Sequence, residues 1–209
     1  YMWQTLGYEL PLPDQGYVDA PVPAGDVVVP ATMYELGARK HSGFAFDNEK
    51  WAHEVILGEF AIAHCAVTNA EYAAFVADGG YSRPEFWSDA GWAMRERLHL
   101  QAPRYWHQAD GAWEQRRFAH REVLRAHEPV MHVSWHEAQA YCRFAKRRLP
   151  TEAEWECAAA WDARDGRKRR YPWGETAPIA EHANLENGGP VAVDACRKGD
   201  SPSGCRQLL

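Results

Sequence analysis

The sequence predicts an α+β fold built from a few short helices, a few short strands and very long ordered loops. Ten Trp, nine Tyr and seven Phe occur among 209 residues, and this aromatic excess indicates loops packed around rings rather than a plain helix bundle. Only short windows show the periodicity of a helix or a strand, and long segments between them show neither. Long loops are uncommon in compact domains, and where they occur they tend to carry function.

The composition is typical of a globular protein. The length of 209 residues is enough for one large domain or for one domain and part of another. Charged residues make up 25% and hydrophobic residues 46%, which excludes global disorder. The net charge of −6 argues against general nucleic-acid binding. No apolar run is long enough to span a bilayer and no secretory leader opens the sequence, so we expect neither a membrane partner nor export.

Residues 1–25 are expected to lie outside the main domain. Residues 1–9 have the spacing of the last turns of a helix, and Gly7 is a suitable residue to end it. The segment that follows contains four prolines, namely Pro11, Pro13, Pro21 and Pro23. Such spacing excludes a helix, so we expect a Pro-rich linker and then a domain over residues 26–209.

Short runs after this boundary have the composition of β-strands, at residues 27–29, 53–57 and 59–63. Residues 43–49 lie between the first and second runs and have no regular period. We expect a loop there. Its paired carboxylates, Asp47 and Glu49, could serve acid–base chemistry, but they are also ordinary turn residues.

Three helices are each expected to begin with a capping box. In this motif a Ser or Thr hydroxyl accepts a hydrogen bond from the backbone amide three residues later, and a Glu at that later position bonds back. The boxes predict helices over about residues 68–77, 134–147 and 151–161. Between the first two, residues 79–118 contain four tryptophans and little periodicity. Within them, Asp110-Gly111 predicts the turn of a hairpin.

Ten histidines are scattered without a spacing typical of zinc or of a facial iron site. His132 and His136 are four residues apart, as in helical metal pairs. Because Ser134 begins a helix between them, an ordinary pair at a helix cap is the favoured interpretation. The sequence therefore predicts no metal ligand set within these residues.

A basic cluster comprises Arg164 and residues 167–170. It could bind phosphate, but a solvated loop near a helix C-terminus, where cations are favoured, is the preferred interpretation. Five cysteines without a C-x-x-C pair favour a reduced, cytoplasmic chain. A bond between Cys196 and Cys205 is left open, since both lie in a loop rich in Gly, Pro and Ser.

Four stretches together resemble domains of the formylglycine-generating-enzyme type. They are PVMHVSWHEA (129–138), AYC (140–142), KRRLPTEAEWE (146–156) and YPWG (171–174). The resemblance implies a C-type-lectin-like fold with little regular secondary structure, which agrees with the loop-rich interpretation above.

Two branches of that superfamily are considered. One is the formylglycine-generating enzyme, a copper-dependent oxidase of sulfatase cysteines. The other comprises the ergothioneine-biosynthesis sulfoxide synthases, non-haem iron enzymes that join sulfur to hercynine with O₂. Four features resemble the second branch: the FDNE loop (46–49), the aromatic insert (79–106), the approach to YPWG (166–174) and an opening similar to the end of a DinB-like helical domain (1–7).

In the second branch the helical domain supplies the iron-binding histidines. The resemblance therefore implies Fe(II) held by an upstream domain absent from this sequence, with O₂ as co-substrate. Residues 204–209 resemble the stretch before a further family motif, so we expect a fragment truncated at its C-terminal side. The implied substrates are hercynine and a thiol or, in the related selenoneine synthases, a selenosugar. The opening residues and the cysteine-rich tail lean toward that relative, but the donor is left open.

A trimethylammonium group such as that of hercynine is stabilised by aromatic faces and carboxylates. We expect Phe44, Phe46 and Asp47 to line its pocket, and we assign no catalytic residue. Asn184 and the Leu185 carbonyl match a calcium-binding pair of the oxidase. The residues that follow offer no clear matching Asp, so calcium is doubtful.

Two other functions stay open, a formylglycine-generating-type oxidase or maturation enzyme and a non-catalytic lectin-like binding module. An upstream helical domain with an H-x-x-x-H-x-E motif would favour the synthase over both.

Overall fold

The computed structural model describes residues 2–8, 25–41, 43–185 and 188–208, with the side chains of Met2 and Trp3 left out. The expected Pro-rich linker lies outside the described residues almost entirely. The chain divides into two compact units, each assembled from separated stretches of sequence. The first unit comprises Tyr1–Pro21, Ala66–Leu149 and Glu186–Val193, and the second comprises Val22–Cys65, Pro150–Leu185 and Asp194–Leu209.

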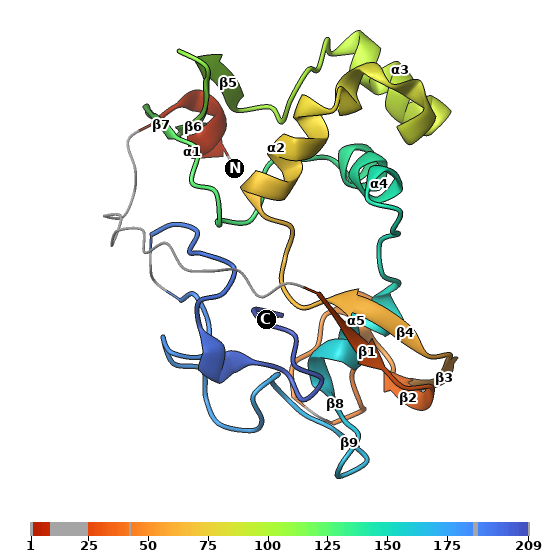
Figure 1. The fold of residues 1–209 in the computed structure, drawn as a ribbon. Helices are drawn as coiled ribbons and strands as arrows, with labels where there is room; N and C mark the ends of the chain where they lie inside the picture. The colour runs from red at the N-terminus through yellow and green to blue at the C-terminus, as the bar shows by residue number, and fades with distance from the viewer. Residues whose placement is uncertain (1, 9–24, 42, 186–187, 209) are drawn as a thin grey trace. The chain divides into compact units, whose positions relative to one another are not determined.

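The first unit combines short helices with one small sheet (Figure 1). Its helices are α1 (Met2–Leu6), α2 (Asn69–Ala77), α3 (Asp89–Arg97) and α4 (Trp135–Phe144), and its strands are β5 (Trp106–Ala109), β6 (Ala112–Arg117) and β7 (His120–Val123). The strands pair antiparallel in the order β5-β6-β7. Asp110 (φ 48°) and Gly111 (φ 81°) form the β5–β6 turn, which confirms the predicted hairpin.

The second unit consists of two-stranded sheets around one helix, α5 (Glu152–Ala160). Its strands are β1 (Asp26–Val29), β2 (Thr32–Leu36), β3 (His53–Leu57), β4 (Phe60–Ala63), β8 (Trp161–Asp162) and β9 (Arg167–Lys168). The antiparallel pairs are β1 with β4, β2 with β3 and β8 with β9. Three of these strands, β1, β3 and β4, lie where the sequence predicts strands.

All three capping boxes form as predicted. Thr68, Ser134 and Thr151 each accept a hydrogen bond from the amide of a Glu three residues later, and each Glu bonds back to the cap amide. The first helix ends at Ala77 as expected. The second ends at Phe144 rather than near Arg147, because the following residues leave the helical conformation and Lys146 adopts φ 55°.

Five helices and strands were not expected from the sequence, namely α3, β2, β7, β8 and β9. Helix α3 begins at Ser88, whose hydroxyl accepts a hydrogen bond from the Gly91 amide at 3.2 Å. Gly91 occupies the position at which a capping box has Glu. The start of α3 therefore lacks the sequence motif that predicted the other three helices. At the N-terminus, α1 ends before Gly7, which has φ 70° as expected of a residue that stops a helix. The domain boundary near residue 25 stays a prediction.

Each unit has its own hydrophobic core. The first is a cluster of aromatic rings around Phe75, which is fully buried and contacts Tyr72, Tyr81 and Tyr141 edge-on or tilted. The second surrounds the fully buried Cys157 with aliphatic and small side chains and with two aromatic rings, those of Tyr34 and Phe60. Short helices and small separate sheets joined by long loops confirm the predicted α+β class.

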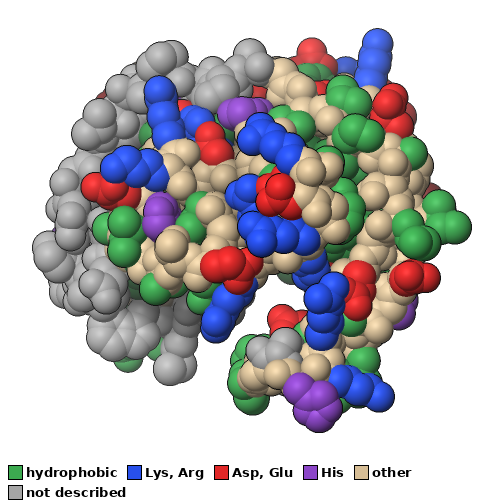
Figure 2. All heavy atoms as spheres, turned by 90° about the horizontal axis from the view of Figure 1, so that it is seen from below, with side chains coloured by type: hydrophobic (Ala, Val, Ile, Leu, Met, Phe, Trp, Pro, Cys, Tyr) green, Lys and Arg blue, Asp and Glu red, His purple; other side chains and the backbone are tan. Residues whose placement is uncertain are grey.

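The surface mixes charges of both signs. On the face drawn in Figure 2, basic and acidic side chains are interspersed, and neither sign covers a continuous area. Among the described residues, no helix is both long enough and apolar enough to cross a lipid bilayer.

Candidate functional site

The predicted substrate-binding residues lie together in the second unit, on the segment 43–51, here called the aromatic loop. The rings of Phe44 and Phe46 meet edge to face, with centroids 5.0 Å apart at an interplanar angle of 81°. Both rings are exposed, at 85% and 63%. Asp47 begins a single 3₁₀ turn, Asp47–Glu49, and its carboxylate also faces solvent. The loop therefore presents two aromatic rings and a carboxylate, but it is an exposed surface in this structure rather than a pocket.

A lysine of the same loop already places an ammonium group against a carboxylate and a ring. Lys50 Nζ lies 2.8 Å from Asp47 Oδ1 and 5.5 Å from the centroid of the Trp51 ring. These are the surroundings that a quaternary ammonium needs. The loop can thus hold a cation, and Lys50 would have to leave Asp47 for a ligand cation to take its place.

The base of the aromatic loop is closed by backbone hydrogen bonds. The Ala38 amide donates to the Glu49 carbonyl at 2.7 Å, and the Ala52 amide donates to the Ala38 carbonyl at 3.0 Å. Gly37 precedes this closure with φ 90°, and a Cβ atom there would lie 2.8 Å from the Glu49 carbonyl oxygen. Only glycine fits both the conformation and the close approach.

Behind the loop, an anchor cluster of Tyr34, Glu156 and Lys168 fixes the end of β2. Tyr34 Oη and the Gly37 amide both donate to Glu156 Oε1, at 2.9 and 3.1 Å. Lys168 Nζ pairs with Glu156 and donates to the Gly37 carbonyl at 2.7 Å. Burial, reinforced by the Glu156 carboxylate, raises the pKa of Tyr34 far above its usual value, so the phenol stays a neutral donor. The cluster positions the segment from which the loop departs.

This anchor corrects the prediction for the basic cluster. Lys168 belongs to the anchor, Arg169 pairs with the buried carboxylate of Asp162, and Arg167 lies 3.3 Å from Asp165. Lys168 and Arg169 are therefore structural partners of carboxylates rather than members of a solvated loop. Sequence reasoning missed this because Tyr34 and Glu156 are 122 residues apart.

The two histidines with helical spacing do not form a metal pair. His132 precedes α4 with φ 61°, and its ring packs edge-on against Tyr105 with centroids 4.8 Å apart. Burial lowers the pKa of His132. His136 lies inside the helix, with Nδ1 3.4 Å from Ser88 Oγ. Ser134 caps the helix between them, as the sequence predicts.

In the described part of the chain, no group of three or more His, Cys, Asp or Glu side chains could hold a metal ion. The residues present therefore do not fit an iron site. Asp194 ends the segment that follows Asn184, where the resemblance to the oxidase implies a calcium ligand. Its carboxylate lies 3.0 Å from the guanidinium of Arg197, which neutralises its charge.

All five cysteines are free thiols, so Cys196 and Cys205 are not bonded to each other. Burial raises the pKa of every one of them, to about 11 for Cys65 and Cys157. Reactive cysteines have a lowered pKa instead. None of the five is thus prepared to act as a thiolate nucleophile.

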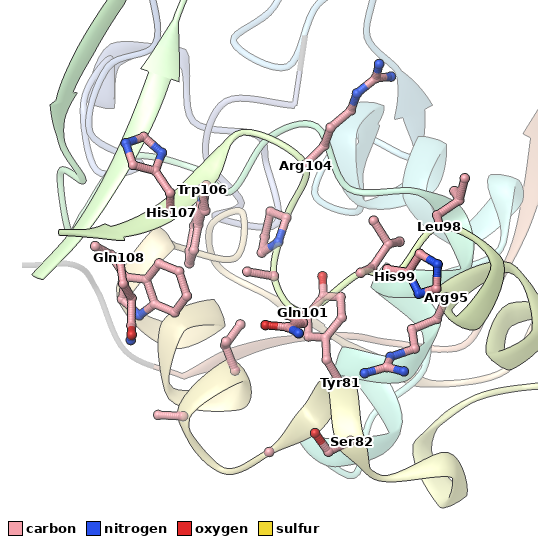
Figure 3. A pocket seen from close by; sticks show the side chains of 17 residues that line it. Tyr81, Ser82, Arg95, Leu98, His99, Gln101, Arg104, Trp106, His107 and Gln108 are labelled. Atoms are coloured by element: carbon pink, nitrogen blue, oxygen red, sulfur yellow. The ribbon is translucent and has the colours of Figure 1, made fainter. Parts of the chain in front are cut away.

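The first unit contains a separate open hollow of about 1110 Å³ (Figure 3). Its wall combines the end of α2 and the residues that follow it, the C-terminal part of α3, the segment 98–104 and the strands β5 and β6. Tyr81, Arg95, His99, Gln101 and Trp106 are among the side chains drawn around it. Sequence reasoning missed this hollow, since it depends on α3, which the sequence pattern does not reveal.

Comparison with known proteins places these features in context. The sequence model of one family, the Sulfatase-modifying factor enzyme 1-like domain, matches residues 18–205. The chain is 49% identical over 168 residues to the hercynine oxygenase of Mycolicibacterium thermoresistibile, which covers 79% of this chain and 37% of that protein. It is 43% identical over 212 residues to the hercynine oxygenase of Mycolicibacterium smegmatis, covering 95% of this chain and 47% of that protein.

A second group of similar proteins carries a different name. The chain is 38% identical over 166 residues to the formylglycine-generating enzyme of Streptomyces coelicolor, covering 72% of this chain and 51% of that protein. The chain spans about half or less of the length of these curated relatives.

Proposed function

We propose that the protein to which this chain belongs oxidises hercynine with O₂. The chain is a member of the Sulfatase-modifying factor enzyme 1-like domain family, which has a C-type-lectin-like fold. In the proposed reaction a C–S or C–Se bond forms on hercynine, as in ergothioneine or selenoneine biosynthesis. The observation that carries the proposal is the greater similarity to hercynine oxygenases than to formylglycine-generating enzymes.

For a thiol donor the proposed reaction is balanced. Hercynine loses one C–H bond and the donor loses its S–H bond, while a C–S bond forms. One oxygen atom of O₂ goes to the sulfur as a sulfoxide, and the other leaves as water with the two hydrogens. O₂ is the only oxidant that this balance needs.

We propose Fe(II) as the cofactor, and iron would supply O₂ activation. The described residues contain no ligand set that fits it. We therefore assign iron binding to residues outside the described part of this chain. The aromatic loop has a proposed role that does not depend on the metal.

That role is to hold the trimethylammonium group of hercynine. The faces of Phe44 and Phe46 would surround the methyl groups, and the Asp47 carboxylate would balance the positive charge. Lys50 now pairs with Asp47, and both groups are near the surface, so the pair costs little to separate. We expect binding to exchange one ammonium for the other.

A second candidate function is a formylglycine-generating-type oxidase, favoured by the similarity to the Streptomyces coelicolor enzyme. The raised pKa of all five cysteines argues against thiolate chemistry by the described residues. The free thiols also support our proposal that the protein works in the reducing cytoplasm.

The test uses the whole natural protein that contains this chain, purified, loaded with Fe(II) and supplied with O₂ and hercynine. Cysteine, γ-glutamylcysteine and a selenosugar are added in separate reactions. A cysteine-containing sulfatase peptide is added to a further sample that is loaded with copper in place of iron. We expect O₂ uptake that depends on hercynine, together with a product mass of a hercynine conjugate for one donor. Conversion of the peptide alone would establish the second candidate. A folded protein that turns over none of these substrates would leave the lectin-like binding module.

The aromatic loop is tested by Asp47→Asn in the same assay. We expect the KM for hercynine to rise about tenfold with little change in kcat, because a partly exposed charge contact is lost. Lys50→Met should lower the KM, since it leaves Asp47 unpaired. Val123→Ala, which trims an exposed side chain in the first unit, is the matched control. Equal KM values in all four proteins would remove the loop from the hercynine site.

A further inference from the structure

We propose that the hollow of the first unit is a binding site for a small organic oxyanion with a planar ring, in which Arg95 pairs with a carboxylate or phosphate group. This proposal is independent of the hercynine reaction, because it concerns other residues and needs neither iron nor O₂.

The first argument is charge. Seventeen residues line the hollow, and they include two arginines and two histidines but no Asp or Glu. One of the histidines, His107, contacts the carboxylate of Glu114 at 3.1 Å from outside the wall. The chain as a whole carries more acidic than basic side chains, 29 against 23. A wall with charges of only one sign in a cleft concentrates the field and attracts ions of the opposite sign. The hollow is therefore suited to an anion.

The second argument is the state of Arg95. Its guanidinium lies 5.1 Å from the centroid of the Trp92 ring, which holds the side chain in place. Its Nε is buried and has no hydrogen-bond partner, and no carboxylate pairs with it among the described residues. Arg83, by contrast, contacts both Asp78 at 2.7 Å and Glu85 at 2.8 Å. A buried donor without an acceptor is unfavourable, and an oxyanion that draws the guanidinium of Arg95 further into the hollow would supply one.

The third argument is the direction of the side chain. Figure 3 shows the guanidinium end of Arg95 turned toward the side of the hollow that carries Tyr81, Ser82 and Gln101. The hydroxyl of Ser82 and the amide of Gln101 are neutral donors that can share an anion with a guanidinium. The planar fork of arginine pairs with two oxygens of a carboxylate or a phosphate at once.

The fourth argument sets the class of ligand. The hollow, at about 1110 Å³, is far larger than an inorganic ion and has the size of a small-molecule site. Trp106 and Trp113 also line it, with ring centroids 5.7 Å apart. Flat aromatic walls favour a flat partner. A ligand that combines an oxyanion with a planar ring satisfies both the arginine and the tryptophans.

The experiment measures equilibrium binding to the whole natural protein by isothermal titration calorimetry, without iron or hercynine. Indole-3-acetate provides a ring with a carboxylate, and adenosine monophosphate provides a ring with a phosphate. Acetate and inorganic phosphate carry the anion alone, and indole-3-acetamide carries the ring alone. We expect saturable binding of at least one of the first two probes, at least tenfold tighter than that of its matching anion or of the amide.

Arg95→Gln should weaken that binding at least tenfold, and Arg95→Lys should weaken it less. Arg97→Gln is the matched control, since Arg97 is an exposed arginine of the same helix outside the hollow, and it should change affinity less than twofold. If Arg95→Gln does not fold, Arg95→Lys carries the test against Arg97→Gln.

Hydrogen exchange of the backbone over residues 95–108 locates the ligand and should slow when it binds. Three results would overturn the proposal: no saturable binding of either ring-bearing anion, equal affinity for the anion alone, or equal weakening by the Arg95 and Arg97 variants.

Discussion

The two units of this chain stabilise their cores with different side chains. In the first unit, aromatic rings contact one another around the fully buried Phe75. In the second, small residues of α5 such as Cys157 and Ala158 let the strands approach closely, and charged pairs such as Glu156 with Lys168 join the elements. Aromatic rings are therefore more numerous in the first core than in the second, to which Tyr34 and Phe60 contribute. Ring contacts thus dominate the first core, whereas the second combines a smaller apolar cluster with charged pairs such as Glu156 with Lys168.

The largest effect should come from removing a ring of the first core. Phe75→Ala should lower the free energy of unfolding by about 3–5 kcal/mol, because it removes buried apolar surface and leaves a cavity. Guanidinium denaturation measures the loss, and hydrogen exchange shows whether α2 opens before β2 and β3. Val123→Ala is the control at an exposed site. A loss below about 1 kcal/mol would show that the ring cluster does not hold the first unit together.

An intermediate effect should come from breaking the anchor cluster of the second unit. Glu156→Gln leaves Lys168 without its counter-charge and should cost about 2–3 kcal/mol, less than for a fully buried pair because both side chains are about a quarter exposed. The double variant with Lys168→Met should recover part of this loss, and urea denaturation measures both. Glu181→Gln breaks an exposed pair with Lys198 and should leave stability unchanged. The interpretation fails if the double variant is less stable than Glu156→Gln.

A smaller effect should be equal in the two units, because both use the same helix cap. Thr68→Ala in the first unit and Thr151→Ala in the second should each lower the free energy of unfolding by about 1 kcal/mol. The two losses should add in the double variant, since the sites share no partner. Thermal unfolding of the three variants provides the measurement. A clear departure from additivity would show that the units are energetically coupled.

The smallest effect concerns pH. Burial raises the pKa of Glu128, although Arg125 lies 3.1 Å from its carboxylate. Because the folded pKa lies above the unfolded value of about 4.3, this group favours folding most at low pH. That contribution is lost as pH rises through the raised pKa. Melting temperatures from pH 4 to 8 should therefore fall with pH in the wild type relative to Glu128→Gln. A constant difference between the two proteins would contradict the shift.

Local signals predicted much of the fold. The capping boxes at Thr68, Ser134 and Thr151 specify where helices begin, because both partners of each box lie within four residues. The Asp110-Gly111 turn is equally local. Helix α3 lacks the box, and β2 is a strand because it pairs with β3 rather than because of its own pattern. Tertiary pairing of this kind leaves no signature in a short window.

The candidate site likewise has a part that the local sequence predicts and a part that depends on residues far apart in the sequence. Phe44, Phe46 and Asp47 are neighbours in sequence, so a single loop brings them together. The Lys50 ammonium beside Asp47 is also local, yet the pattern does not reveal which cation the carboxylate prefers. The anchor behind the loop depends on Glu156 and Lys168, which no local rule connects to residue 37.

The five protonated thiols have a consequence for how this chain tolerates its chemical surroundings. Thiol–disulfide exchange begins with attack by a thiolate. A thiol with a pKa of about 11, such as that of Cys65 or Cys157, is ionised in only about one molecule in ten thousand at neutral pH. The chain should therefore resist forming mixed disulfides even when small thiols and their oxidised forms are abundant. Maleimide and iodoacetamide should likewise label it slowly until it unfolds.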